Sequence, residues 1–230
     1  MFEIHGGCGF SKRLLHIFSQ VAYCSTRMLQ DGKTPVVPVT AEFLYDQLVQ
    51  MHQWSAEYES WNAAKSRHQP IEWIPQTVKS YVVQEAKQMI EVMAEAWRLA
   101  GMVYLQLPRN NHMVIGNIAD LVKCISIMPA SGTMFIANAP LLQVFFLGLL
   151  TTVEEHVEGA NAWFEQVIRT PVRSLLLYFL RQSVTPLYGA LDRIQSWMDR
   201  EFPLPSPNVE PLRTISERQP WWEIMVAQVQ

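Results

Sequence analysis

The chain has 230 residues, of which 49% are hydrophobic and 17% are charged, and its formal net charge at pH 7 is −3. This length suits one ordinary domain, and so apolar a composition excludes a disordered chain. The basic residues are scattered singly or in short pairs such as Lys12-Arg13, so charge gives no basis for binding nucleic acid. The cysteines, Cys8, Cys24 and Cys124, form no CxxC pair, and neither a zinc ribbon nor a disulfide framework is predicted.

The first predicted helix follows Ser11, which can cap it, and ends before Asp31-Gly32. Its expected inner face consists of Leu14, Leu15, Phe18, Val21, Ala22 and Met28. The segment 31–40 is rich in proline, which resists helix formation. We therefore expect a surface connection there.

A long amphipathic helix is predicted from Val82 to Leu107, because apolar residues recur there at three- and four-residue steps. A second apolar column widens the expected buried face: Val83, Ile90, Trp97 and Tyr104. The opposite face would be polar and carries Gln84, Lys87, Gln88, Glu91 and Glu95.

Two further helices are predicted later in the chain. One has the stripe Ile118, Leu121, Val122 and Ile125. The other would begin at Thr185-Pro186, a cap followed by proline, with Leu187, Leu191, Ile194 and Met198 behind it. A second proline-rich connection is expected at 203–211. Since alternating period-two runs are essentially absent, we predict an all-α fold, a single irregular domain of packed amphipathic helices over 1–230.

The segment from Met134 to Val153 carries no charge over about the length that a bilayer requires. Pro140 lies in its interior, polar residues dilute it, and its strictly apolar part, Val144 to Leu150, is short. We therefore favour a buried core helix over a membrane span. Gly148 would let a neighbouring helix approach closely.

Three short motifs resemble chemical sites. The acids and histidine of EEHVE, 154–158, imitate the magnesium motif of terpene cyclases, but no second ligand motif follows and HExxH is absent. We expect a solvated helix end there. GKT at 32–34 lacks the first glycine of a phosphate loop, and GGCGF around Cys8 lacks the pattern of a nucleophile elbow. We predict no catalytic, cofactor-binding or metal-binding residue.

Large aromatic residues gather in two stretches: Trp54, Tyr58, Trp61 and Trp73, and the pair Trp221-Trp222. Such rings mark partner or ligand contacts when they lie at a surface. The alternative is that they close the core over short helices.

Several stretches, taken together and in order, resemble the regulatory domain that follows the zinc cluster of fungal-specific transcription factors. They are GFSKRLLHIFSQVAYCSTRM, EAWRLAGMVYLQL, PRNNHMVIGNIADLVKCISIMP, APLLQVFFLGLLTT, WFEQVI and ERQPWWE. The residues that carry this resemblance, an expected family core, are Leu14, Leu15, Trp97, Tyr104, Leu141, Phe145, Phe146, Trp163, Trp221 and Trp222.

The resemblance implies a non-catalytic helical domain in the nucleus that regulates transcription through protein partners or a small-molecule effector. A homodimer is a further candidate, and no contact with nucleic acid or membrane is expected. The central helix would place Leu141, Leu142, Phe145 and Phe146 against the face from Trp97 to Tyr104.

The chain departs from the family in three places. It lacks the six-cysteine zinc cluster that binds DNA, so we expect a DNA-binding part that is truncated or was never present. A truncated form would also fit the cytoplasm, and zinc is expected only in that missing part. The helix ending in YLQL reaches Pro108 early. LLLYFLRQ, 175–182, is interpreted as an apolar insertion that packs poorly.

Two other function classes stay open on the sequence. The first is an α-helical enzyme or lipid-binding protein with an aromatic-lined pocket of terpenoid size, which would need acids converging on a deep apolar cavity if it were an enzyme. The second is a membrane-associated helical protein that uses the segment from Met134 to Val153.

Overall fold

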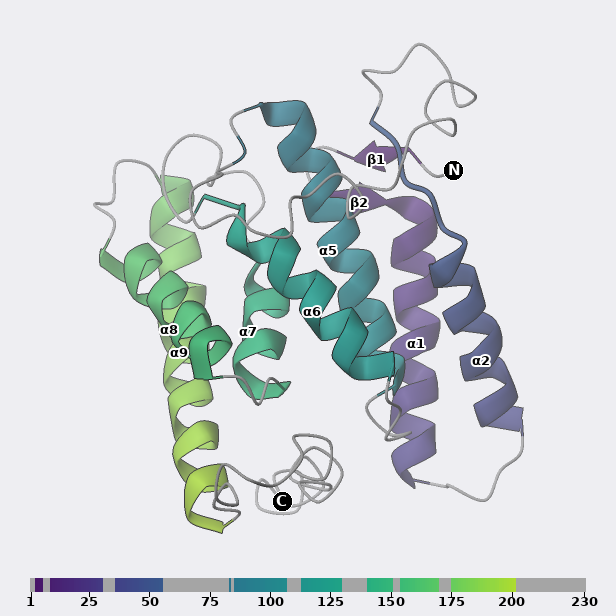
Figure 1. The fold of residues 1–230 in the computed structure, drawn as a ribbon. Helices are drawn as coiled ribbons and strands as arrows, with labels where there is room; N and C mark the ends of the chain where they lie inside the picture. Colours follow the sequence, from purple (N-terminus) through teal and green to yellow (C-terminus); the bar gives the residue numbers. More distant parts are fainter. Residues whose placement is uncertain are drawn as a thin grey trace. The chain divides into compact units, whose positions relative to one another are not determined.

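The computed structural model describes residues 3–5, 9–30, 36–55, 83, 85–106, 113–129, 140–150, 154–169 and 175–201. Helices dominate this part of the chain, which confirms the all-α class (Figure 1). The chain divides into two compact units, Met1–Val144 and Phe145–Gln230, and each is described by itself. The single domain over 1–230 stays a prediction. The connection 203–211 and the aromatic residues Tyr58, Trp61, Trp73, Trp221 and Trp222 lie outside the described residues.

A small antiparallel ribbon opens the first unit. Strand β1 (Ile4–His5) pairs with β2 (Phe10–Ser11), with Ile4 opposite Ser11. Gly9 precedes β2 with a φ of 72°, in the left-handed region that glycine tolerates. The buried hydroxyl of Ser11 then accepts a hydrogen bond from the backbone N–H of Leu14 at 3.3 Å. The predicted cap is therefore confirmed.

Helix α1 (Lys12–Gln30) buries a narrower stripe than predicted. Leu14, Ile17, Val21 and Cys24 face inward at three- and four-residue steps. Leu15 lies about 100° away around the helix and is 56% exposed, so its assignment to the core is wrong. Ala22 is exposed for the same reason.

Helix α2 (Val36–Val49) begins inside the segment where a connection was predicted. Residues 36–40 of the expected loop 31–40 are helical, and only its first five residues lie outside the described part. Pro38 is the third residue of α2, in a first turn whose N–H groups have no partner within the helix. Proline there costs no helical hydrogen bond, so it does not prevent the helix from starting at Val36.

Helix α5 (Ala86–Gln106) is the central helix of the first unit and packs against α1, α2, α6 and the ribbon (Figure 1). It is buried on nearly every side rather than on one face. Consequently, the predicted polar face is only partly right: Glu91 is half-buried and Glu95 is buried. A helix surrounded by neighbours must hold its charged residues in pairs.

Helix α6 (Met113–Ser126) buries Ile118, Leu121 and Ile125 of its predicted stripe, whereas Val122 is half-buried. Beside this stripe, the buried Asn117 donates hydrogen bonds to Gln106 Oε1 at 2.9 Å and to Tyr45 Oη at 3.4 Å. These bonds connect α6 with α5 and α2.

Helix α7 (Leu141–Leu150) begins in the first unit and ends in the second. With its amide oxygen toward α5, the buried Gln143 accepts a hydrogen bond from Trp97 Nε1 at 3.0 Å and donates one to the Pro140 carbonyl at 3.2 Å. Trp97 also contacts Phe10 and Phe18, with ring centroids 5.0 and 5.6 Å away. The indole therefore joins the start of α7 to β2, α1 and α5.

The second unit continues with α8 (Glu154–Arg169) and α9 (Leu175–Glu201), which pack against each other (Figure 1). A Cβ at Gly148 would lie 2.8 Å from Leu191 Cδ2 and 3.4 Å from Ala160 Cβ, so α9 and α8 approach α7 as closely as the glycine was expected to allow. Gln195 Nε2 donates to the Gly148 carbonyl at 2.8 Å.

The predicted start of the last helix at Thr185-Pro186 is wrong, because Pro186 lies inside α9. Apolar residues upstream of the proline extend the helix back to Leu175, although proline removes one backbone donor from its interior. The segment 175–182 is thus helical, while the side chains of 175–181 lie outside the described residues. The predicted poor packing of this segment stays a prediction.

Candidate functional site

The first unit exposes a set of large apolar side chains on two of its helices. Among the residues that the structure describes, all six such side chains belong to α1 or α2: Leu15, Tyr23, Val36, Val39, Phe43 and Val49. Their exposed fractions run from 46% for Val49 to 67% for Val36. Single exposed apolar residues are normal in a folded protein, but a group of them marks a contact surface.

The pattern of α2 explains why this surface exists. Ala41, Leu44 and Leu48 point into the core, as an ordinary amphipathic helix requires. Val36, Val39 and Phe43, at i, i+3 and i+7, form a second stripe that is exposed. The first stripe packs in the core of the first unit, whereas the exposed second stripe takes no part in that core.

A groove runs between α1 and α2, with a volume of about 540 Å³. Among the residues that line it are Tyr23, Cys24, Arg27, Val36, Thr40 and Phe43. Arg27 is exposed and is the one charged side chain among the described lining residues. Tyr23 and Phe43 are 63% and 59% exposed, so the groove is open to solvent rather than enclosed.

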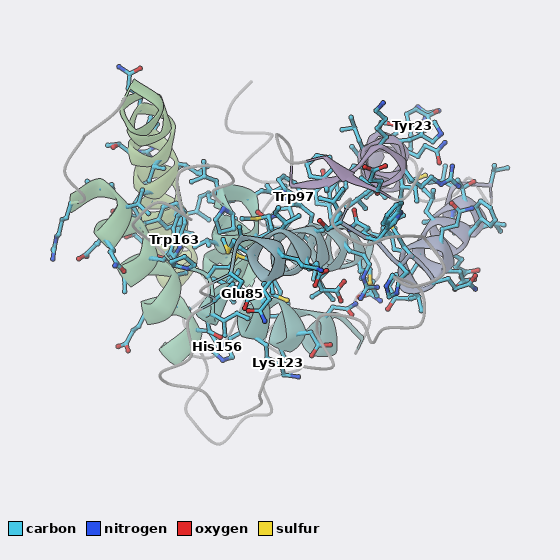
Figure 2. All side chains as sticks on the ribbon, turned by 90° about the horizontal axis from the view of Figure 1, so that it is seen from above. Tyr23, Glu85, Trp97, Lys123, His156 and Trp163 are labelled. Atoms are coloured by element: carbon cyan, nitrogen blue, oxygen red, sulfur yellow. The ribbon has the colours of Figure 1, made fainter. Side chains whose placement is uncertain are left out.

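We call Tyr23, Val36, Val39, Phe43 and the groove beside them the outer face. Figure 2 shows Tyr23 on the side of α1 that faces away from α5. Near the start of α1 and the end of α2, Arg13 Nη2 donates a hydrogen bond to Gln47 Oε1 at 2.7 Å. This bond shows that Arg13 lies level with Gln47 along the two helices. Because Tyr23 and Val36 both line the groove, Tyr23 lies level with the start of α2.

The two helices carry opposite charges. Helix α1 contains the basic residues Lys12, Arg13 and Arg27, together with His16, and no acid, whereas α2 contains Glu42 and Asp46 and no base. Lys12, His16, Glu42 and Asp46 are exposed. The outer face therefore has a basic border along α1 and an acidic border along α2.

A buried ion pair lies on the other side of α2. Arg98 Nε and Nη2 donate to the two carboxylate oxygens of Glu95 at 2.8 and 2.7 Å, and Arg98 Nη1 donates to the Leu48 carbonyl at 2.8 Å. Burial by itself lowers the pKa of Arg98, but the hydrogen bond and charge of Glu95 raise it more. The geometry joins α5 to the last turn of α2, which is a structural role.

Cys124 lies close to this pair and is fully buried. Burial first, and then the charge of Glu95, raises the pKa of its thiol well above the usual 9.0. Burial also raises the pKa of Cys24, the cysteine that lines the groove. Since the thiolate is the reactive form, neither environment suits a nucleophile.

The raised pKa of Cys124 predicts a pH dependence of stability. A thiol whose pKa is higher in the folded state contributes stability that is present below the unfolded value of 9.0 and is lost as the pH rises toward the folded value. Above pH 9 we expect this thiol to contribute a fall of about 1.4 kcal/mol per pH unit in the free energy of unfolding. Urea unfolding between pH 7 and the alkaline range, in the native chain and in Cys124→Ala, measures it. The variant should show a shallower alkaline slope, and equal slopes would contradict the prediction.

The structure places the expected family core as follows. Leu14 and Trp163 are buried, whereas Trp97, Tyr104, Leu141, Phe145 and Phe146 are half-buried and Leu15 is exposed. The expected packing of Phe145 and Phe146 on α5 joins residues of different units and stays a prediction. Trp54, from the other aromatic group, is half-buried, and its carbonyl accepts a hydrogen bond from the Ile4 N–H at 2.7 Å.

The motif EEHVE begins helix α8, so its acids lie at the N-terminus of that helix. His156 is half-buried there. In the described part of the chain, no three side chains of His, Cys, Asp or Glu come close enough to hold a metal ion. None of the helices in that part combines the length and the apolar character needed to cross a membrane. The segment from Met134 to Val153 contains the ten-residue α7.

Sequence reasoning missed the outer face because it treated 31–40 as a loop. The signal was present: the apolar spacing of Val36, Val39 and Phe43 continues that of a helix, alongside the inner stripe. Pro35 and Pro38 made the same segment resemble a loop.

Comparison of the chain with models of known protein families, with curated proteins and with solved structures finds no match.

Proposed function

We propose that this chain is a non-catalytic regulatory domain of the kind that follows the zinc cluster in fungal-specific transcription factors, and that it acts through its outer face. The observation that carries the proposal is the concentration of exposed large apolar side chains on α1 and α2. Burying them against a partner would contribute roughly 25 cal/mol per Å² of apolar area. A nuclear protein partner is the occupant that this function requires.

The all-α fold and the ordered family stretches support this proposal. Two buried polar side chains of the first unit, Arg98 and Asn117, make hydrogen bonds that connect helices, which is a structural role. The proposed domain itself needs no cofactor and no contact with DNA.

A reporter assay tests the proposed function. The full chain, fused to an unrelated DNA-binding domain in a fungal cell, is expected to change expression of the matching reporter. Tyr23→Ser/Phe43→Ser should abolish the change at equal protein level, because it removes both rings from the outer face. Tyr23→Phe/Phe43→Tyr keeps both rings and serves as the matched control. A fusion that leaves the reporter unchanged, or one whose effect survives the serine variant, argues against the proposal.

The groove favours a second candidate, a lipid-binding protein. Its volume of about 540 Å³ lies within the range of small-molecule sites, and Arg27 suits a carboxylate attached to an apolar body. Saturable binding of a fluorescent fatty acid, lost in both Arg27→Ala and Phe43→Ser, would support this candidate. The open groove leaves much of such a ligand in water, so we rank it second.

A further inference from the structure

We propose that the outer face binds the same face of a second copy of this chain, so that α1 of each copy packs against α2 of the other. This inference rests on the proposed function, since it names the partner of the same surface. The two copies would be related by a two-fold axis that runs parallel to α1 and α2. Four helices, two from each copy, would then form a bundle.

Charge is the first observation that selects this partner. In the arrangement proposed, the basic border of α1 meets the acidic border of α2 in the second copy, and the two-fold axis repeats the contact. The alternative pairing, α1 against α1 and α2 against α2, places like charges together. Because α1 has no acids and α2 has no bases, the two copies are complementary in charge only when α1 of one copy packs against α2 of the other.

Register is the second observation. A two-fold axis parallel to the helices keeps every residue at its own level along the bundle. The bond between Arg13 and Gln47 shows that the first turn of α1 is level with the last turn of α2. Lys12 and His16 of one copy would therefore reach the level of Asp46 of the other, with Glu42 one turn away.

The apolar residues match in the same register. The lining of the groove shows that Tyr23 is level with Val36 and Thr40 within one chain. In the pair, Tyr23 of one copy would meet Val36 and Val39 of the other. Each α2 has 14 residues, so the contact is about 21 Å long, and an interface of this extent is small and readily reversible.

Sedimentation of the purified full chain tests the inference, with Lys12→Glu/His16→Glu as the α1 variant and Glu42→Lys/Asp46→Lys as the α2 variant. We expect the native chain to form a reversible dimer that weakens in high salt. Each variant alone should dimerise about tenfold more weakly or worse, because both cross-contacts become repulsive. An equal mixture of the two variants should regain the native affinity, since each reversed helix then meets an opposite charge.

Rescue in the mixture separates this inference from misfolding, because a variant that fails to fold cannot be rescued. Glu85→Lys, an exposed charge reversal on the other side of α5 from Tyr23, should leave the dimer unchanged (Figure 2). A native chain that stays monomeric, a dimer indifferent to both variants, or a mixture no tighter than its components would overturn the inference. If the chain is monomeric and still changes the reporter through Tyr23 and Phe43, the proposed function stands and the occupant is a different protein.

Discussion

Arg98→Ala is expected to lower the free energy of unfolding by about 3–5 kcal/mol, the range for removing one partner of a buried ion pair. The guanidinium satisfies both carboxylate oxygens of Glu95 and the Leu48 carbonyl. Truncation leaves a buried carboxylate and a backbone acceptor without a donor, and opens space between α5 and α2. Urea unfolding followed by circular dichroism at neutral pH measures the loss.

The matched control is the double variant Glu95→Leu/Arg98→Met, which removes both charges and keeps most of the volume. Replacing a buried ion pair by apolar residues is often neutral or stabilising, so the double variant should recover most of the stability. If it is as unstable as Arg98→Ala, the loss comes from packing or the Leu48 contact rather than from the buried charge. If Arg98→Ala costs under about 1 kcal/mol, the pair behaves as a surface ion pair and this description of α5 is wrong.

Phe164→Ala is expected to destabilise the second unit by about 3–5 kcal/mol. Phe164 is fully buried, its ring stacks on Tyr188 at 5.4 Å, and it meets the edge of Trp163 at 5.4 Å. Removing the ring therefore takes away the stacked aromatic contact between α8 and α9. Urea unfolding followed by circular dichroism measures the loss.

Phe164→Leu is the control, because it keeps an apolar side chain in the same place and loses the ring contacts. It should cost clearly less than the alanine variant. Equal losses would show that the contact with Tyr188, rather than the filled volume, stabilises the packing of α8 on α9.

The helical class followed from the sequence because apolar periodicity is a local property. The cap at Ser11 and most of the stripe of α6 depend on a few neighbouring residues, and both are confirmed. The close approach expected at Gly148 is also present, although it involves helices distant in the sequence. Local signals of this kind survive folding when tertiary contacts agree with them.

The predictions were wrong where contacts with other helices, rather than the local sequence, determine the structure. Glu95 reads as a surface residue until Arg98, one turn later, is seen to pair with it beneath α2. Pro186 reads as the start of a helix, yet α9 extends back to Leu175. Prolines at 35 and 38 read as a loop, although Pro38 fits the first turn of α2.

The candidate site could be predicted least. A stripe on α2 is apolar whether it enters the core or meets a partner, and the sequence alone does not say which of two apolar stripes is inward. Only the packing of Ala41, Leu44 and Leu48 against α1 and α5 leaves Val36, Val39 and Phe43 as the exposed stripe.

The central claim is that the outer face of α1 and α2 is a contact surface for a second copy of this chain. The most direct measurement places a photo-crosslinking side chain at position 43 of the full chain, with position 85 as the control, and records the products after illumination. We predict an adduct of twice the mass of the chain from position 43 and none from position 85. No adduct from position 43, or equal yields from both positions, would contradict the claim.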